Sequence, residues 1–281
     1  MGIGELVWDM LPTGRQLGGA PVNFTYWCGR LGAAGYPVSA VGGDEPGQQA
    51  LERLARTGLD VGYVQRSALP TGRVDVTFSG DGIPAYEIVE GVAWDALEAD
   101  DRTLALAARA DAVCWGSLAQ RAERSRKAVA AILAATGPDC LKVFDINIRR
   151  PWYGREVVAD SLAAADVLKL NEEELPLVAS IFGIEGADAE IAAELVRRFA
   201  LRYVVYTAGA DRSEIYGAGG LLSGMKTPRV EVIDTVGAGD SFTAAFVTSL
   251  LQGEAIADCH RKAVDTAAGV CRQHGAIPEA L

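Results

Sequence analysis

The strongest constraint on the fold is an alternation of short apolar runs, rich in β-branched residues, with longer segments of helical periodicity. From residue 38 onward the two kinds of segment follow one another along the chain. Such alternation predicts a parallel sheet with crossover helices, which is an α/β fold. The predicted strands and helices pair as Val38–Val41 with Gln48–Arg56, Ala112–Trp115 with Arg121–Ala135, and Lys142–Phe144 with Glu156–Ala165. The pattern continues with Val167–Leu170, a helix after Asn171, and Tyr203–Tyr206.

Residues 61–90 break this alternation, because they hold no helical period. Turn sequences at Leu69–Gly72 and Gly80–Gly82 separate three strand-like runs. These runs are Val61–Arg66, Arg73–Phe78 and Ala85–Val89. We therefore expect a small antiparallel sheet of three strands, the alternative being an edge meander of the main sheet.

Composition narrows the class of protein. A chain of 281 residues can bury a large core, and α/β enzymes of this length are often one domain, so we expect a single domain over residues 1–281. A net charge of −11 argues against a nucleic-acid partner, which needs a basic face. The sequence shows neither an apolar stretch of about 18 residues nor a signal peptide, which predicts a cytoplasmic protein without a membrane partner. The five cysteines form no Cys-x-x-Cys pair and are expected to be reduced core thiols.

A glycine-punctuated turn near the C-terminus runs directly into an apolar helical segment. Residues 234–242 read Asp-Thr-Val-Gly-Ala-Gly-Asp-Ser-Phe, and the predicted helix covers Ser241–Leu251. Gly237 and Gly239 allow backbone angles that point consecutive N–H groups at one spot, to which the helix N-terminus adds positive charge. Asp240 is then placed to accept a proton from a hydroxyl that attacks a bound phosphoryl group. The alternative is that Asp240 only caps the helix.

Short polar residues near other turns are candidates for binding a ligand. Asp9 and Asn23 flank the Gly18-Gly19 turn and suit hydrogen bonds to sugar hydroxyls. On the residues alone, capping, turn formation or, for Asn23, an exposed polar position is the commoner role. Arg149 follows a strand end and is able to grip a phosphate or a sugar, but a solvated loop arginine is commoner.

The segment Asn171-Glu172-Glu173-Glu174 is, on ordinary grounds, the acidic first turn of a helix that Asn171 caps. Asp234, with backbone oxygens near Val236 and in the Cys271–Ala276 segment, is a weaker candidate for holding a monovalent cation.

Four separated motifs resemble, in order, those of the PfkB (ribokinase-like) carbohydrate kinases. They are Gly18-Gly19-Ala20-Pro21-Val22-Asn23, Asn171-Glu172-Glu173-Glu174, Thr207-Ala208-Gly209 and the turn at residues 234–242. The resemblance spans essentially the whole chain. It implies a ribokinase-like three-layer sandwich with a mostly parallel central sheet. It also implies a small β lid over the sugar, contributed mainly by residues 60–92, through which such proteins often form homodimers.

The resemblance also implies roles for individual residues. Asp240 would be the catalytic base, and the amides of Gly237, Ala238 and Gly239 the anion hole. Substrate contacts would come from Asp9, Gly19, Asn23 and Arg149, and nucleotide contacts from Asn171, Thr207 and Gly209. Glu174 would act on Mg²⁺ through water, which magnesium is reluctant to shed, and Asp234 would hold K⁺.

Two further stretches are similar to those of bacterial fructokinases: Phe144-Asp145-Ile146-Asn147-Ile148-Arg149, and residues 87–95. They imply transfer of the γ-phosphoryl group of ATP to D-fructose, giving fructose 6-phosphate. A 2-keto-3-deoxygluconate kinase or a nucleoside kinase on the same scaffold is the alternative within the family. A non-catalytic sugar-binding regulator is the alternative from another class.

Other nucleotide signatures fail on spacing. The run Gly219–Thr227 looks like a Walker loop, but Met225 separates its glycine from its lysine, so a hairpin is expected. No glycine-rich run has the three glycines of a dinucleotide fingerprint, which disfavours a dehydrogenase. Residues 4–9 resemble the end of the family's first strand, and the sequence leaves open whether that strand is cut short or begins at Met1.

Overall fold

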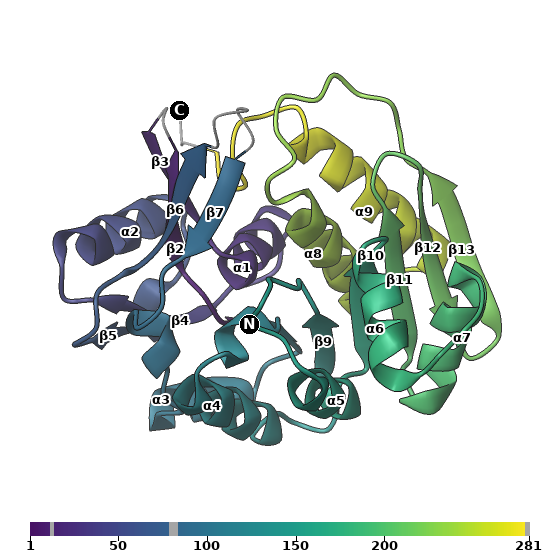
Figure 1. Ribbon diagram of the computed structural model, residues 1–281, viewed down its shortest axis with the longest axis horizontal. Helices are drawn as coiled ribbons and strands as arrows, with labels where there is room; N and C mark the ends of the chain where they lie inside the picture. The colour runs from purple at the N-terminus through teal and green to yellow at the C-terminus, as the bar shows by residue number, and fades with distance from the viewer. Residues whose placement is uncertain (12–13, 79–83, 279–281) are drawn as a thin grey trace.

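The computed structural model describes residues 1–11, 14–78 and 84–278, and its largest element is a sheet of nine strands (Figure 1). From one edge to the other the strands are β13 (Gly220–Lys226), β12 (Arg212–Gly217), β11 (Tyr203–Ala208), β10 (Val167–Asn171), β9 (Leu141–Asp145), β8 (Ala112–Trp115), β1 (Gly2–Ile3), β4 (Pro37–Gly42) and β5 (Val64–Ser67). The β11–β12 and β12–β13 pairs are antiparallel, and the second of them is the expected hairpin. The remaining pairs are parallel, so the carboxyl ends of β9, β10 and β11 lie at one edge.

Helices cover both faces of this sheet, because successive strand residues point to opposite sides. On β8, Val113 and Trp115 join one apolar core while Cys114 joins the other. The first core holds α3 (Asp101–Ala107), α4 (Glu123–Ala134), α5 (Arg155–Ala164), α6 (Glu174–Phe182) and α7 (Asp188–Arg198). The second holds α1 (Ala20–Arg30), α8 (Ala238–Leu251) and α9 (Ile256–Val270). The mostly parallel α/β sandwich expected from the sequence is confirmed.

A second sheet of four strands stands apart from the first (Figure 1). Its order is β3 (Gly14–Gly18), β2 (Val7–Leu11), β6 (Gly72–Phe78) and β7 (Pro84–Ile88). The β2–β6 pair is parallel and the other two pairs are antiparallel. Val7, Val74 and Ile88 share a small apolar cluster with Trp94 and Leu118, which attaches this sheet to the rest of the molecule.

The composition of the small sheet corrects one prediction. Val61–Arg66 was expected to belong to it, but β5 is the edge strand of the main sheet and pairs in parallel with β4. Val64 is buried in a core beside α2 (Glu45–Arg56), and this tertiary contact decides the pairing. The strands β2 and β3 instead supply half of the small sheet, so the range 60–92 was incomplete. The turn predicted at Gly80–Gly82 lies outside the described residues.

Three smaller observations concern the cysteines, the histidines and the length of the helices. All five cysteines are free thiols, and four of them are buried. His260 lies in α9, whereas His274 lies beyond the end of that helix at Val270. Among the helices that the structure describes, none is both long and apolar enough to span a bilayer.

Candidate active site

The segment that leads into α8, residues 234–240, is called the anion turn below, and its last three residues belong to the first turn of that helix. Gly237 has φ 79°, and a Cβ at this position would lie 2.3 Å from Cβ of Ala276, so only glycine fits. Asp240 is in the first turn of α8, yet no side chain caps this helix. The capping interpretation of Asp240 is therefore wrong.

The carboxylate of Asp240 instead contacts the N-terminal part of α1. Asn23 Nδ2 donates a hydrogen bond of 2.8 Å to Asp240 Oδ2 across 217 residues of sequence. Asn23 is 4% exposed, and its Oδ1 finds no partner among the described residues. Gly19 directly precedes α1 with φ 118°, and a Cβ there would lie 2.3 Å from the carbonyl oxygen of Glu5. The fold thus brings the Gly-Gly turn and the anion turn together, as a shared site requires.

Asp240 is half-buried as a residue, but protein atoms surround its carboxylate group. Burial, followed by the nearby charge of Asp145, raises the pKa of Asp240 to about 6. The hydrogen bond from Asn23 and the positive charges of Lys169 and Arg149 act in the opposite direction. A carboxylate with this pKa is ionised at neutral pH and remains a useful proton acceptor.

Two other carboxyl groups lie near Arg149. Burial raises the pKa of Asp9, on β2, to about 6, and Arg149 opposes this shift. Burial also raises the pKa of Glu5 to about 7. Glu5 Oε1 accepts from the Ala20 amide at 3.1 Å, while Oε2 has no described partner. Arg149 itself is exposed, and its charge acts on Asp9, Glu5 and Asp240 together.

Asn171 and Glu174 hold each other at the start of α6. Asn171 Oδ1 accepts from the Glu174 amide at 3.0 Å, and Glu174 Oε2 accepts from the Asn171 amide at 2.9 Å. Glu174 Oε1 accepts from the Ile148 amide at 2.7 Å, so this carboxylate joins the ends of β9 and β10. Asn171, at the end of β10, accepts from the amides of Glu173 and Glu174, but Glu173 is the N-cap residue of α6 and no side chain caps that helix. Glu174 is 4% exposed and is no surface residue of a helix turn.

The remaining predicted residues lie farther along the same edge of the sheet. Thr207 stands directly opposite Asn171 in the register of β10 and β11. Gly209 has φ 45°, and a Cβ there would lie 2.7 Å from Glu172 Oε1. Asp234 accepts from the amides of Val236 and Gly275 at 3.0 and 2.9 Å, which ties the anion turn to the Cys271–Ala276 segment.

Sequence reasoning assigned no role to three buried charged residues at this site: Glu5, Asp145 and Lys169. The available signal was Lys169, a lysine inside the run Val-Leu-Lys-Leu, because parallel strands usually read as continuous apolar runs. Asp145 lies in the stretch Phe144–Arg149, which is similar to one in bacterial fructokinases but suggested no role for this residue.

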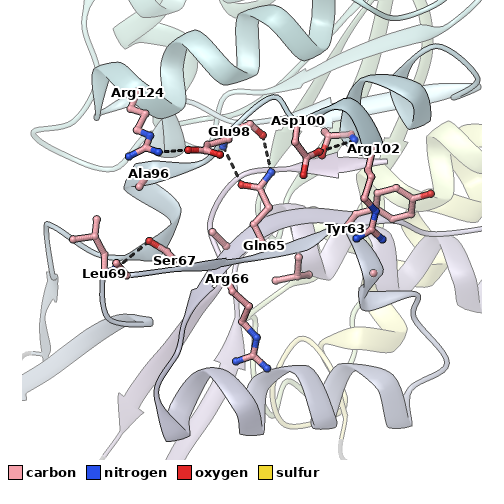
Figure 2. Close-up of a pocket in the computed structure, with 15 residues that line it drawn as sticks. Tyr63, Gln65, Arg66, Ser67, Leu69, Ala96, Glu98, Asp100, Arg102 and Arg124 are labelled. Carbon is pink, nitrogen blue, oxygen red and sulfur yellow. Dashed lines mark hydrogen bonds and ion pairs between the residues drawn. The ribbon is translucent and has the colours of Figure 1, made fainter.

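A pocket of about 660 Å³ lies elsewhere, along β5 (Figure 2). Gln65, Glu98, Arg102 and Arg124 are among the residues that line it, and Gln65 and Glu98 are joined by hydrogen bonds (Figure 2). None of the predicted site residues lines it. The charged groups around Asp240, rather than this pocket, therefore form the candidate active site.

Comparison with known proteins decides the family of this chain. Residues 6–280 match the model of the pfkB family carbohydrate kinases. The chain belongs to this family. It is 32% identical to the fructokinase of Klebsiella pneumoniae over 264 residues, which are 88% of this chain and 83% of that protein.

Solved structures agree with this pfkB-family assignment at the level of the fold. A sugar kinase of Pyrococcus horikoshii in complex with ATP superposes with a TM-score of 0.83 at 24% identity, covering 98% of this chain and 92% of that one. A double mutant of Vibrio cholerae fructokinase with fructose, ADP and potassium bound has a TM-score of 0.83 at 22% identity, covering 99% and 93%. The ribokinase-like fold and the family resemblance are confirmed, and the protein is a sugar kinase of the pfkB family.

Proposed function

We propose that this protein transfers the γ-phosphoryl group of ATP to a sugar hydroxyl, with D-fructose as substrate and fructose 6-phosphate as product. One observation carries the proposal: Asn23 and Asp240 are joined at 2.8 Å. This hydrogen bond places the proposed base beside the turn that we assign to the sugar. A hydroxyl held there lies within reach of a carboxylate at the mouth of an anion-binding helix terminus.

The proposed mechanism relies on position rather than on a strong base. Asp240 accepts the proton of the attacking hydroxyl, while the amides of Gly237, Ala238 and Gly239 stabilise charge on the moving phosphoryl group. In a loose transition state the proton leaves late, so a carboxylate with a pKa of about 6 is sufficient.

Asp9, Gly19, Asn23 and Arg149 are the proposed sugar-binding residues. Asn23 Oδ1 is a buried acceptor without a described partner, and such an oxygen typically costs about 1–3 kcal/mol. A sugar hydroxyl that donates to it would recover this cost, so the orphaned oxygen supports a polyol ligand at this position.

Asn171, Thr207 and Gly209 are the proposed nucleotide-side residues, with Mg²⁺ near Glu174 and K⁺ near Asp234. Both Glu174 oxygens already accept backbone amides, which favours contact with Mg²⁺ through water over direct ligation. Both Asp234 oxygens likewise accept amides, so backbone carbonyls would have to supply part of a K⁺ site.

The magnesium assignment predicts that Glu174→Gln raises the Mg²⁺ concentration for half-maximal rate more than it raises the KM for the sugar. Mg²⁺ titrations at saturating ATP and sugar measure this. An unchanged dependence of the rate on Mg²⁺ would mean that Glu174 only holds the ends of β9 and β10 together.

Fructose is proposed on the strength of the fructokinase relative, whose identity of 32% does not by itself fix the substrate. The alternatives remain 2-keto-3-deoxygluconate, a nucleoside, or a sugar that is bound without turnover. A panel of these acceptors in a coupled assay for ADP release, with a no-acceptor control, tests the proposal. We expect the highest kcat/KM with fructose. Faster turnover of another acceptor would make that acceptor the proposed substrate. The absence of ADP release with every acceptor would contradict the proposed kinase activity.

We also propose that the small sheet mediates a homodimer, as the family resemblance implies, and that the exposed Met10 on β2 lies at its interface. Light scattering of the wild type and of Met10→Lys tests this, and a monomeric wild type would contradict it.

A further inference from the structure

A buried ion pair lies directly beneath the anion turn. Lys169 Nζ is 3.3 Å from Asp145 Oδ1, and the two side chains are 9% and 7% exposed. Lys169 on β10 and Asp145 on β9 are neighbours in the parallel register. Burying two charges costs several kcal/mol per ion, and an apolar pair often serves stability as well. The position of this pair therefore calls for a reason beyond packing.

The pair contacts the anion turn from two sides. A Cβ at Gly239 would lie 3.0 Å from Lys169 Nζ, so the ammonium lies against this glycine. Thr243 Oγ1 donates to Asp145 Oδ2 at 2.8 Å and also lies 3.0 Å from the carbonyl oxygen of Gly239. The first turn of α8, which carries Gly239 and Asp240, thus rests on both charges.

The hydrogen bonding of the pair is incomplete. Its contact is an ion pair without hydrogen-bond geometry, since Asp145 Oδ1 accepts no hydrogen bond from any described residue. An ammonium has three donors, and Asp145 is the one residue in the described part of the chain whose carboxylate forms an ion pair with Lys169 Nζ. Under-satisfied buried charges of this kind are typical of functional sites.

We propose that Lys169 and Asp145 are positioning residues, which hold the anion turn in place and balance the charge of Asp240 when a phosphoryl group arrives. This inference rests on the proposed kinase function. Lys169 supplies a fixed positive charge next to Gly239, and Asp145 anchors both Lys169 and Thr243. Neither residue is assigned a bond-making step.

The two partners act on Asp240 with opposite sign. Asp145 raises the pKa of Asp240, whereas Lys169 lowers it. The positive charge of Lys169 is secure, because the carboxylates of Asp145, Glu174 and Asp240 outweigh its burial and raise its pKa. The charged or titratable groups that face Asp240 from the surrounding elements are Glu5, Cys114, Asp145, Arg149 and Lys169. Cys114 stays neutral, because burial raises its pKa well above the usual value.

This opposition gives a test that structural damage cannot imitate. Lys169→Met should move the acidic limb of the pH–rate profile to higher pH by about one unit, and Asp145→Asn should move it to lower pH by a similar amount. Each variant should also lose about tenfold or more in kcat, because the anion turn loses its support. Lys142→Met, three residues before Asp145 on β9, is the matched control and should keep the wild-type profile.

The wild type in the same ADP-release assay separates the two claims. An inactive wild type would contradict the proposed function. An active wild type whose acidic limb stays in place in both variants, or moves the same way in both, would overturn the inference about Lys169 alone. If Lys169→Met does not fold, the double variant Lys169→Met/Asp145→Asn leaves no uncompensated charge and is expected to fold. It should then show an acidic limb near that of the wild type with lowered kcat, and wild-type kcat would overturn the inference.

Discussion

Two buried ion pairs in this molecule differ in how completely their polar groups are satisfied. Arg121 binds both oxygens of Asp95, at 2.8 and 2.9 Å, and donates to the carbonyl oxygen of Val89 at 2.6 Å. Its guanidinium also stacks 3.9 Å from the ring centroid of Trp94. Lys169, in contrast, has one ionic contact at 3.3 Å.

The difference distinguishes a structural ion pair, that of Arg121 and Asp95, from an ion pair in the candidate active site, that of Lys169 and Asp145. Val89 follows β7, and Asp95 also accepts from the amides of Gly91 and Val92, so the Arg121 pair fixes the chain where it leaves the small sheet. A pair with full hydrogen bonding holds structure, whereas the Lys169 pair keeps bonding capacity beside the proposed phosphoryl site. The comparison therefore predicts large effects on stability at one pair and on catalysis at the other.

The largest expected effect on stability is at the Arg121–Asp95 pair. Arg121→Met leaves Asp95 buried without its partner and should lower the free energy of unfolding by about 3–5 kcal/mol. Arg124→Met is the matched control, because Arg124 pairs with Glu98 through side chains that are 62% and 58% exposed. It should cost less than about 1 kcal/mol. Urea unfolding measures both, and equal losses would remove the distinction between buried and exposed pairs.

A smaller effect is expected at His260, a buried polar residue that carries no charge. It lies between Ser213 and Ser223 at 2.7 and 2.8 Å, and burial lowers its pKa to about 4. Because the folded pKa lies below the usual 6.5, its stabilising effect is complete above pH 6.5 and is lost as the pH falls toward 4. The loss is about 1.4 kcal/mol per pH unit.

The His260 prediction is checked by unfolding the wild type and His260→Gln between pH 7 and pH 5. The stability difference between them should shrink as the pH falls, because glutamine does not titrate. A stability difference that stays constant with pH would show that protonation of His260 does not destabilise the folded protein.

The smallest effect is expected in the small sheet. If it closes over the sugar, amides in β6 and β7 should gain hydrogen-exchange protection when fructose is added. Those of β5 should not, since β5 belongs to the main sheet. Core amides at Lys142–Phe144 serve as the internal control. Equal protection of β6 and β7 with and without saturating sugar would mean that the sheet is rigid.

The sequence predicted the parts of the fold that depend on local periodicity. The strand at Ala112–Trp115 and the helix after it, α4, follow from patterns that one segment carries by itself. Which sheet a short strand joins is a tertiary property. Val61–Arg66 reads as a strand in either sheet, and the burial of Val64 beside α2 decides between them.

The same limit applies to the site. Asp240, Asn23 and Glu174 were predicted because their motifs are local, whereas the bond between Asn23 and Asp240 spans 217 residues. The ion pairs of Lys169 and Arg121 each join separate segments, so no spacing rule reveals them. Only the charge inside the apolar run of β10 hinted at Lys169.

The central claim is that Asp240 is the base of a phosphoryl transfer. The most direct measurement is kcat of Asp240→Asn with saturating ATP and sugar, since the side chain keeps its size and its bond to Asn23 can persist. We predict a loss of roughly 10²–10⁴-fold while both substrates still bind by calorimetry. Asp258→Asn on α9, whose side chain is 55% exposed, should turn over like the wild type. Near-wild-type kcat in Asp240→Asn would contradict the claim.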